Sequence, residues 1–270
     1  MRNSEPALIL LRGGGDLASG VALRLHRAGL CVVITELSQP LAVRRAVSFA
    51  EAIYEGVHQV EGVTARRVEP NQVREVLAAG EIPVLVDPDA GILHSSLFFP
   101  VLVDGRLLKT PPHPLPVDVP LHIGLGPGFH AGLNCHAVVE TRRSHTLGRV
   151  YWEGTAQPDS GEPEGDPRRV LRAPGEGALM SRAAIGDHLE EGQLVAVISD
   201  RHQIVSPLKG VLRGLVRDGL HVTEGLKIGD VDPRDDASAC YLVSDKALAI
   251  GGAVLEVILT KEEIRKRLWK

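Results

Sequence analysis

The sequence is poor in aromatic residues, cysteine and methionine, and no apolar run approaches the length of a membrane span. Of its 270 residues, 3% are aromatic and only 2 are methionine. A scarcity of aromatic rings disfavours a surface that stacks nucleobases. The lack of an apolar run of about 20 residues disfavours a membrane helix. We therefore expect a protein with no nucleic-acid interface and no membrane span.

The chain also has no large excess of positive or negative charge, and we expect no targeting segment. The formal net charge is −4, and the charged residues are mixed along the chain, so we expect no basic patch. The first residues, 1–6, show no signal-peptide pattern. Cys31, Cys135 and Cys240 lie far apart in the sequence, which is typical of reduced thiols. These features predict a cytoplasmic location.

Glycine and proline, by contrast, are plentiful, with 29 and 18 residues. The length favours two domains over one. From the order of apolar runs and turns we predict four segments: a nucleotide-binding domain over residues 1–147, a linker over 148–170, a duplicated β domain over 171–232, and a helical C-terminal segment over 233–270.

The clearest functional pattern lies in residues 7–36. The apolar run 7–11 does not alternate with polar residues, which predicts a strand buried on both faces, and residues 31–34 predict a second strand. Between them, three glycines (13–15) precede a stretch with helical periodicity that ends at Gly29. This unit predicts a Rossmann-like α/β domain with a mostly parallel open sheet.

The triple glycine is a candidate phosphate-binding turn. Without Cβ atoms the backbone can approach a phosphate, and the free N–H groups of the following helix point at it. Gly13, Gly15 and Ala18 meet the dinucleotide pattern G-x-G-x-x-G/A. Glu36 follows about twenty residues later, where a carboxylate binds ribose hydroxyls and repels a 2′-phosphate. The cofactor contacts predicted in this unit are Gly13, Gly14, Gly15, Asp16, Leu17, Gly20 and Glu36.

Asp16 departs from the usual pattern. A carboxylate in the first helical turn suits the helix dipole, but it lies where a pyrophosphate would arrive. We interpret it as facing a ligand hydroxyl or a metal. The alternative for the whole unit is a glycine-rich turn in an open sheet that binds nothing.

A helix is predicted after Glu36, with Ser38 as its N-cap and Pro40 in its first turn. It would place Arg44 and Arg45 near the carboxyl end of the second strand, the edge at which open α/β sheets bind ligands. Two arginines there can bind an anion bidentately. The alternative is a solvated helix face whose arginines bind nothing.

The rest of the first domain repeats the alternation of strands and turns. Further strands are predicted at residues 64–68, 82–86, 101–103 and 121–125, and a helix at 70–79. Gly124, Gly126 and Gly128 follow the last of these strands. Pro127 makes that glycine turn rigid, and we predict that it wraps a second part of the ligand.

His130, Cys135 and His136 lie within a few residues of one another. Imidazole and thiolate groups bind transition metals, but this spacing fits no standard zinc pattern, so we predict no metal site. A second interpretation makes Cys135 a nucleophile with a histidine base. A third is a plain strand at residues 136–141.

An internal repeat occupies residues 171–232. Its special positions recur at a fixed offset, with Pro174, Gly177, Gly186 and Gly192 matched by Pro207, Gly210, Gly219 and Gly225. Duplicated short strands with glycine turns predict a small pseudo-symmetric β domain. It resembles the barrel-sandwich hybrid fold of biotinyl and lipoyl carrier domains. The turn between its halves, residues 198–204, has no lysine to carry a swinging arm, so we expect it to dock against the first domain or a partner.

Two connecting segments complete the chain. Residues 157–168 are polar and rich in proline and glycine, which predicts a long surface loop. After the repeat, Ser244 is a predicted N-cap for an apolar helix over residues 244–255. The polar residues 261–270 either extend this helix or fray from its end.

With these pieces placed, the chain resembles the YqeB family of selenium-dependent molybdenum hydroxylase accessory proteins over nearly its whole length. The resemblance is carried by residues 12–20 (RGGGDLASG), 40–45 (PLAVRR), 124–129 (GLGPGF), 139–142 (VETR) and 227–234 (KIGDVDPR). The family is related more loosely to the Rossmann domain of XdhC-type chaperones, which help mature the molybdenum cofactor of xanthine dehydrogenases. Residues 142–145, Arg-Arg-Ser-His, replace the family's usual Arg-Gly-His, which removes a flexible glycine beside His145.

Three hypotheses follow. The resemblance implies an accessory protein that binds a nucleotide or a molybdopterin dinucleotide, with a molybdenum hydroxylase or a cofactor-maturation enzyme as partner; homodimerisation is compatible with it. The second hypothesis is an NAD-dependent oxidoreductase, for which Glu36 favours NAD over NADP, although no Tyr-x-x-x-Lys pair follows. The third is a non-catalytic docking protein for a molybdenum enzyme. No catalytic residue is assigned in any of the three.

Overall fold

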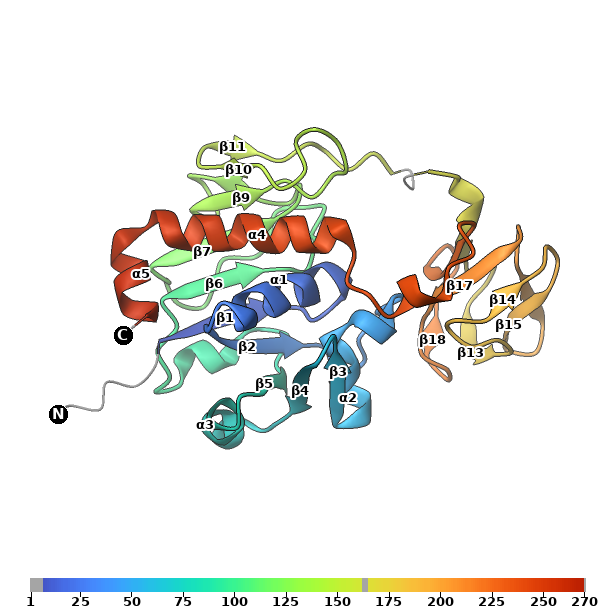
Figure 1. Ribbon diagram of the computed structural model, residues 1–270, viewed down its shortest axis with the longest axis horizontal. Coiled ribbons are helices and arrows are strands. Elements are labelled where there is room, and N and C mark those ends of the chain that lie inside the picture. The colour runs from blue at the N-terminus through green and yellow to red at the C-terminus, as the bar shows by residue number, and fades with distance from the viewer. Residues whose placement is uncertain (1–6, 162–164, 270) are drawn as a thin grey trace.

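The computed structural model describes residues 7–161 and 165–269 as a mixed α/β fold with one large sheet and several small antiparallel sheets (Figure 1). The large sheet contains, in spatial order, β10 (Val150–Tyr151), β9 (Ala137–Val139), β7 (Leu121–Leu125), β6 (Val101–Asp104), β1 (Leu8–Arg12), β2 (Cys31–Glu36), β5 (Ile82–Val86), β4 (Val63–Arg67) and β3 (Val57–Val60). Neighbouring strands run parallel except in the two outermost pairs, β10–β9 and β4–β3. The predicted mostly parallel sheet is confirmed.

Helices cover both faces of this sheet. They are α1 (Asp16–Arg27), α2 (Ala52–Glu55), α3 (Val73–Ala78), α4 (Asp245–Thr260) and α5 (Glu262–Leu268). In β1, Ile9 and Leu11 share a core with residues of α1 and α4, whereas Leu8 and Leu10 share another with residues of α3. The apolar run of β1 does not alternate because each face of the strand meets its own layer. No helix in the described ranges combines the length and apolar character that a bilayer span requires.

The repeat domain, residues 171–232, lies beyond one end of the large sheet (Figure 1). Its two four-stranded sheets contain β12 (Val170–Arg172), β19 (Lys227–Asp232), β17 (Gly210–Leu215) and β14 (His188–Leu189) in one, and β16 (His202–Val205), β15 (Leu194–Ile198), β13 (Gly177–Ser181) and β18 (His221–Val222) in the other. Each half lends a strand to the other: Gly177 lies opposite Val222, and Gly210 opposite Leu189. This equivalent pairing is the structural counterpart of the sequence repeat.

The prediction of a helix after Glu36 is wrong. The chain instead forms two short 3₁₀ turns, Arg45–Val47 and Phe49–Glu51, before α2. The N–H of Ala50 donates to the Gly14 carbonyl and the N–H of Phe49 to the Ser19 hydroxyl. These tertiary hydrogen bonds engage backbone groups that a regular helix would have used internally. Residues of the turns therefore pack beside the glycine turn.

The C-terminal helix is close to its prediction. The Ser244 hydroxyl accepts the N–H of Ala247, so the predicted N-cap is confirmed. The chain then returns from the repeat domain to the large sheet, where α4 packs beside α1 (Figure 1). The polar end forms a separate helix, α5, rather than an extension. The hairpin of β3 and β4 includes one strand, β3, that the sequence reasoning missed.

Candidate functional site

A cavity of about 1610 Å³ lies between the large sheet and the repeat domain, and we call it the interdomain cavity. Its walls come from the glycine turn after β1, the segments after β2 and β6, and strands β17 and β19. The carboxyl ends of parallel strands, where open α/β sheets bind ligands, form one side. Both halves of the chain therefore contribute to one candidate site.

The three glycines of the turn have different reasons to be glycine. A Cβ on Gly14 would lie 2.9 Å from the Ala50 nitrogen, so this position is filled by the protein itself. Gly13 has a φ of +88°, a conformation that side chains rarely adopt. A Cβ on Gly15 would meet nothing within 4 Å, and Gly15 lines the cavity. Gly15 is the position where the turn leaves open space.

The N-terminus of α1 opens into that space. Gly15, Asp16, Leu17 and Ala18 line the cavity, and within the described chain their N–H groups donate to no hydrogen-bond partner. Gly15 offers no side chain to cap them. Unpaired N–H groups at the positive end of a helix dipole attract anions. The donors that a phosphate would need are unpaired at these residues, and phosphate binding at this turn stays a prediction.

Glu36 lies against the glycine turn. One carboxylate oxygen accepts the Gly14 N–H at 2.6 Å and the other accepts the Leu37 N–H at 2.8 Å. Burial raises the pKa of this carboxyl, and the two backbone donors oppose the rise. Each oxygen keeps a lone pair for a further donor, and Glu36 lines the cavity. A ribose contact at Glu36 stays a prediction.

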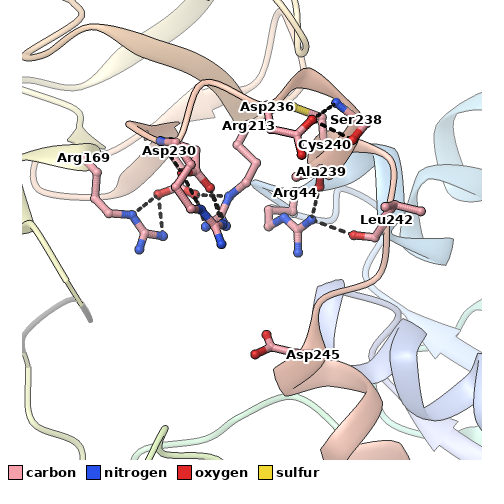
Figure 2. A network of polar contacts seen from close by, with 12 residues as sticks. Arg44, Arg169, Arg213, Asp230, Asp236, Ser238, Ala239, Cys240, Leu242 and Asp245 are labelled. Atoms are coloured by element: carbon pink, nitrogen blue, oxygen red, sulfur yellow. Dashed lines mark hydrogen bonds and ion pairs between the residues drawn. The ribbon is translucent and has the colours of Figure 1, made fainter.

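Asp16 forms an ion pair with Arg44 in the wall of the cavity. Both oxygens of Asp16 lie 3.2 Å from Arg44 Nη1. Arg44 is only 8% exposed, and its Nη2 donates to the carbonyls of Ala239 and Leu242 at 3.1 and 2.9 Å (Figure 2). Asp16 thus has a protein partner as well as a place in the cavity lining, and a ligand contact at Asp16 stays a prediction. Arg44 connects α1 to the segment that leads into α4.

Arg45 points into the domain interface. Its Nε donates to the Leu215 carbonyl at 3.1 Å, and its Nη1 lies 3.5 Å from a Glu51 oxygen. Glu51 is 2% exposed and also pairs with Arg217 of the repeat domain. Arg45 is absent from the cavity lining in the described structure. Both guanidinium groups of the predicted arginine pair therefore have partners within the protein, and each connects separate elements of this chain.

Gly20 is buried between helices instead of facing a cofactor. A Cβ on Gly20 would lie 2.6 Å from the Ala247 Cβ and 2.8 Å from the Ala247 backbone. The glycine thus permits the close approach of α1 and α4. Gly20 does not line the interdomain cavity, whereas Leu17, one turn earlier, does.

At the second glycine turn, residues 124–128, other parts of the protein occupy most of the space beside the glycines. A Cβ on Gly124 would lie 2.1 Å from the Phe129 ring, and one on Gly128 would lie 2.5 Å from the Leu108 carbonyl oxygen. Gly126 has a φ of +90°, which favours glycine at a turn. Of residues 124–128, the cavity is lined by Pro127. The element supports the cavity wall, and a wrapped ligand at these glycines stays a prediction.

A buried arginine beneath the glycine turn was missed by the sequence reasoning. Arg12 ends β1, lines the cavity and is 6% exposed; its Nη2 donates to the Pro88 carbonyl at 2.7 Å. Its Nε is buried without a hydrogen-bond partner among the described residues. Burial lowers the Arg12 pKa, nearby Arg106 lowers it further, and Asp104 opposes both. The available signal was an arginine directly before the glycines, at the carboxyl end of a strand.

Two cations beside Asp230, Arg169 just before the repeat domain and Arg213 within it, were missed as well. Arg169 and Arg213 converge on the carboxylate of Asp230, which is 1% exposed. Figure 2 shows their guanidinium groups in a row with that of Arg44, and all three arginines line the interdomain cavity together with Asp245. Periodicity could not find this row because its members lie in three distant parts of the sequence. The only signal was the charged run 227–234.

The histidines and cysteine at residues 130–136 do not converge. His130 and His136 are exposed, and Cys135 is buried. His136 Nδ1 accepts the His122 N–H at 2.9 Å. In the described residues no group of three or more histidine, cysteine or acidic side chains could hold a metal ion. Burial raises the pKa of the Cys135 thiol to about 11, which opposes a nucleophilic role.

We expect Cys135 to react slowly with iodoacetamide at pH 8. With a pKa of about 11, roughly one thiol in a thousand is ionised at that pH, and the thiolate is the reactive form. Mass spectrometry of the modified peptides would measure the rate, with urea-unfolded protein as the control. Alkylation of Cys135 as fast in the folded protein as in urea would contradict this expectation.

No protein-family model matches the chain. Among solved structures, an aspartoacylase family protein from Mesorhizobium loti is 13% identical, with a TM-score of 0.28 over 84% of this chain and 85% of that one. The ectoine utilization protein EutE from Ruegeria pomeroyi is 14% identical, with a TM-score of 0.27 over 86% of each chain. Scores this low carry no argument about this chain.

A sequence relative is much more similar. The chain is 44% identical over 267 residues to a protein of Escherichia coli (strain K12) described as "Uncharacterized protein YqeB". The alignment covers 96% of this chain and 49% of that protein, so the chain spans about half the length of the relative it matches. The similarity to this protein thus extends over nearly all of the chain and about half of the relative.

Proposed function

We propose that this chain binds the phosphate-bearing part of a nucleotide or of a molybdopterin-type cofactor in the interdomain cavity. The observation that carries the proposal is the N-terminus of α1, whose unpaired N–H groups open beside Gly15 into the cavity. Backbone donors and the helix dipole together favour a bound phosphate there. Glu36, beside the same turn, offers acceptors for a hydroxyl of the ligand.

The apolar part of the cavity supports a ligand with a ring. Leu37, Leu41 and Leu242 line the cavity and are 50%, 44% and 53% exposed. Such exposure of large apolar side chains at a concave site is typical of ligand pockets, in which a few polar groups fix the orientation of the ligand. A nucleobase or a pterin would cover these leucines while its phosphate reaches α1.

The resemblance to accessory proteins extends the proposal to a role. The chain would hold the cofactor during maturation of a molybdenum hydroxylase, with that enzyme or a cofactor-maturation enzyme as its partner. A Rossmann-like first domain and a barrel-sandwich-like repeat domain would suit this role, since the former binds nucleotides and the latter docks. The mostly parallel sheet supports the first assignment, and the pairing of strands between the two halves of the repeat supports the second.

Titration calorimetry on the purified chain tests the binding step, with ADP, CDP, NADH and a molybdopterin species as probes. Gly15→Val should weaken binding of the preferred probe at least tenfold, as expected for the loss of charge-assisted hydrogen bonds of about 1.5–3 kcal/mol. Folding should be unaffected because a Cβ at Gly15 meets nothing within 4 Å and its φ of −68° suits any residue.

The matched control is Gly252→Ala, at an exposed position of α4 that does not line the cavity and where a Cβ also meets nothing within 4 Å. It should leave binding unchanged. If no probe binds to the unmodified chain, or if Gly15→Val binds as well as the unmodified chain, the proposal is rejected. A preference for NADH would favour the oxidoreductase hypothesis instead.

A further inference from the structure

We propose that the repeat domain supplies a second anion subsite in the interdomain cavity, formed by Lys227 with Arg169 and Arg213, and that the ligand is therefore a diphosphate held between both domains. The inference deepens the proposed function and rests on it. It adds a ligand class, an ester or anhydride with two adjacent phosphoryl groups, and a binding role for the repeat domain.

Lys227 is the central observation. It begins β19, lines the cavity and is exposed to the solvent there. Within the described chain its ammonium group has no hydrogen bond or ion pair. Although solvent reaches its side chain, the surrounding cavity wall partly desolvates the ammonium group and lowers the Lys227 pKa; Arg169 and Arg213 lower it further, while Asp230 and Asp16 oppose the change. The surroundings of Lys227 carry too little negative charge to balance its ammonium group, and a bound anion would supply that charge.

The neighbouring arginines are already fixed in place. Asp230 accepts from Arg169 Nε at 2.9 Å and from Arg213 Nε at 2.7 Å. Asp232, on the same strand, accepts from Arg213 Nη1 at 3.1 Å. The arginines therefore need not be ordered when a ligand arrives, which lowers the entropic cost of binding. Planar guanidinium groups are well suited to phosphoryl oxygens.

The fold does not require these charges. Because the two halves of the repeat are related by a fixed offset, Lys227, Arg213 and the Asp230 that pairs with Arg213 each have a counterpart in the other half. Arg213 corresponds to Met180, Lys227 to Leu194 and Asp230 to Val197. The paired strands are equivalent, since β13 pairs with β15 as β17 pairs with β19. Apolar residues suffice in one half, so the charges of the other half serve something besides the fold.

The two subsites face the same ligand. Lys227 lines the same cavity as residues 15–18, whose N–H groups at the start of α1 have no partner in the described chain. A single phosphate at α1 would leave the cluster around Lys227 without an anion. A diphosphate offers one phosphoryl group to the helix and the next to Lys227.

The test uses calorimetry with inorganic pyrophosphate, with ADP and with adenosine. Lys227→Leu introduces the residue found in the equivalent position of the other half. We expect it to weaken pyrophosphate and ADP at least tenfold and to leave the melting temperature unchanged, whereas Lys227→Arg should retain most of the affinity. The matched control is Lys209→Leu, because Lys209 is exposed, pairs with Glu190 and lies outside the cavity lining. If Lys227→Leu does not fold, Arg213→Met takes its place with the same expectation.

The outcomes separate the two proposals. Loss of ADP binding in Gly15→Val but not in Lys227→Leu would overturn the second subsite and keep the proposed function. Pyrophosphate binding that depends on Lys227, without binding of any nucleotide or molybdopterin species, would keep the subsite and overturn the proposed function. Failure of pyrophosphate to bind the unmodified chain would overturn the subsite.

Discussion

Replacement of Arg44 by alanine should lower the free energy of unfolding by about 3 kcal/mol, because it removes a buried guanidinium with several partners. Arg44 pairs with Asp16 and donates to the carbonyls of Ala239 and Leu242. After the substitution these two carbonyls lose a charged donor, and Asp16 keeps its charge without a counterion. Since the Asp16 side chain is 27% exposed, water compensates part of that loss.

Thermal melting and urea unfolding would measure the effect. For a chain of this size, 1 kcal/mol corresponds to a shift of roughly 2–4 °C in the melting temperature, so Arg44→Ala should melt about 6–12 °C lower. Arg182→Ala is the control: the exposed Arg182 side chain donates only to the adjacent Ser181 carbonyl among the described residues, so its loss should change stability by less than about 0.5 kcal/mol. A wild-type melting temperature for Arg44→Ala together with lost ligand binding would show that Arg44 serves the ligand instead.

Gly124→Val should cost about 3–5 kcal/mol, or prevent folding, because β7 has no room for a side chain at this position. The first added atom would lie 2.1 Å from Cγ of Phe129, which is fully buried. Either the ring leaves its place in the core or the strand shifts in the middle of a parallel sheet. The strand preference of valine is too small to offset either change.

A double mutant makes this prediction specific. If the clash with the ring is the cause, Gly124→Val combined with Phe129→Ala should be less destabilised than the sum of the two single changes, since the valine occupies space that the ring vacates. Gly252→Ala, at an open position in α4, should instead stabilise the chain by about 0.5–1 kcal/mol. Additive losses in the double mutant would point to a different cause than the Phe129 ring.

The parts of the fold that depend on neighbouring residues were predictable. The apolar run of β1, the three glycines and the periodicity of α1 all describe interactions within about 30 residues, and the structure has these elements in that order. The Ser244 cap depends on one hydroxyl and one N–H three residues later. The repeat was visible because both halves need glycine at equivalent turns. Local geometry alone determines each of these features.

The segment after Glu36 shows where such reasoning ends. Ser38 and Pro40 are good helix-starting residues, but the backbone of residues 49 and 50 is bound by Ser19 and Gly14 from another element. Arg44 and Arg45 were predicted to bind an anion, and in the structure they pair with Asp16 and Glu51. An arginine has the same chemistry in both roles, and only the position of the nearest carboxylate decides between them.

The sequence by itself determined that a strand, a glycine turn and a helix would form, and that a duplicated β domain would follow. Only the tertiary structure decided which glycine faces open space, because glycine permits the close approach of a ligand and of the chain itself equally well. Gly15 is beside the cavity, whereas Gly20 and Gly124 are filled by Ala247 and Phe129. In the same way, Lys227 and Gly15 line one cavity only because the two domains pack together, and no local pattern brings together residues more than 200 positions apart.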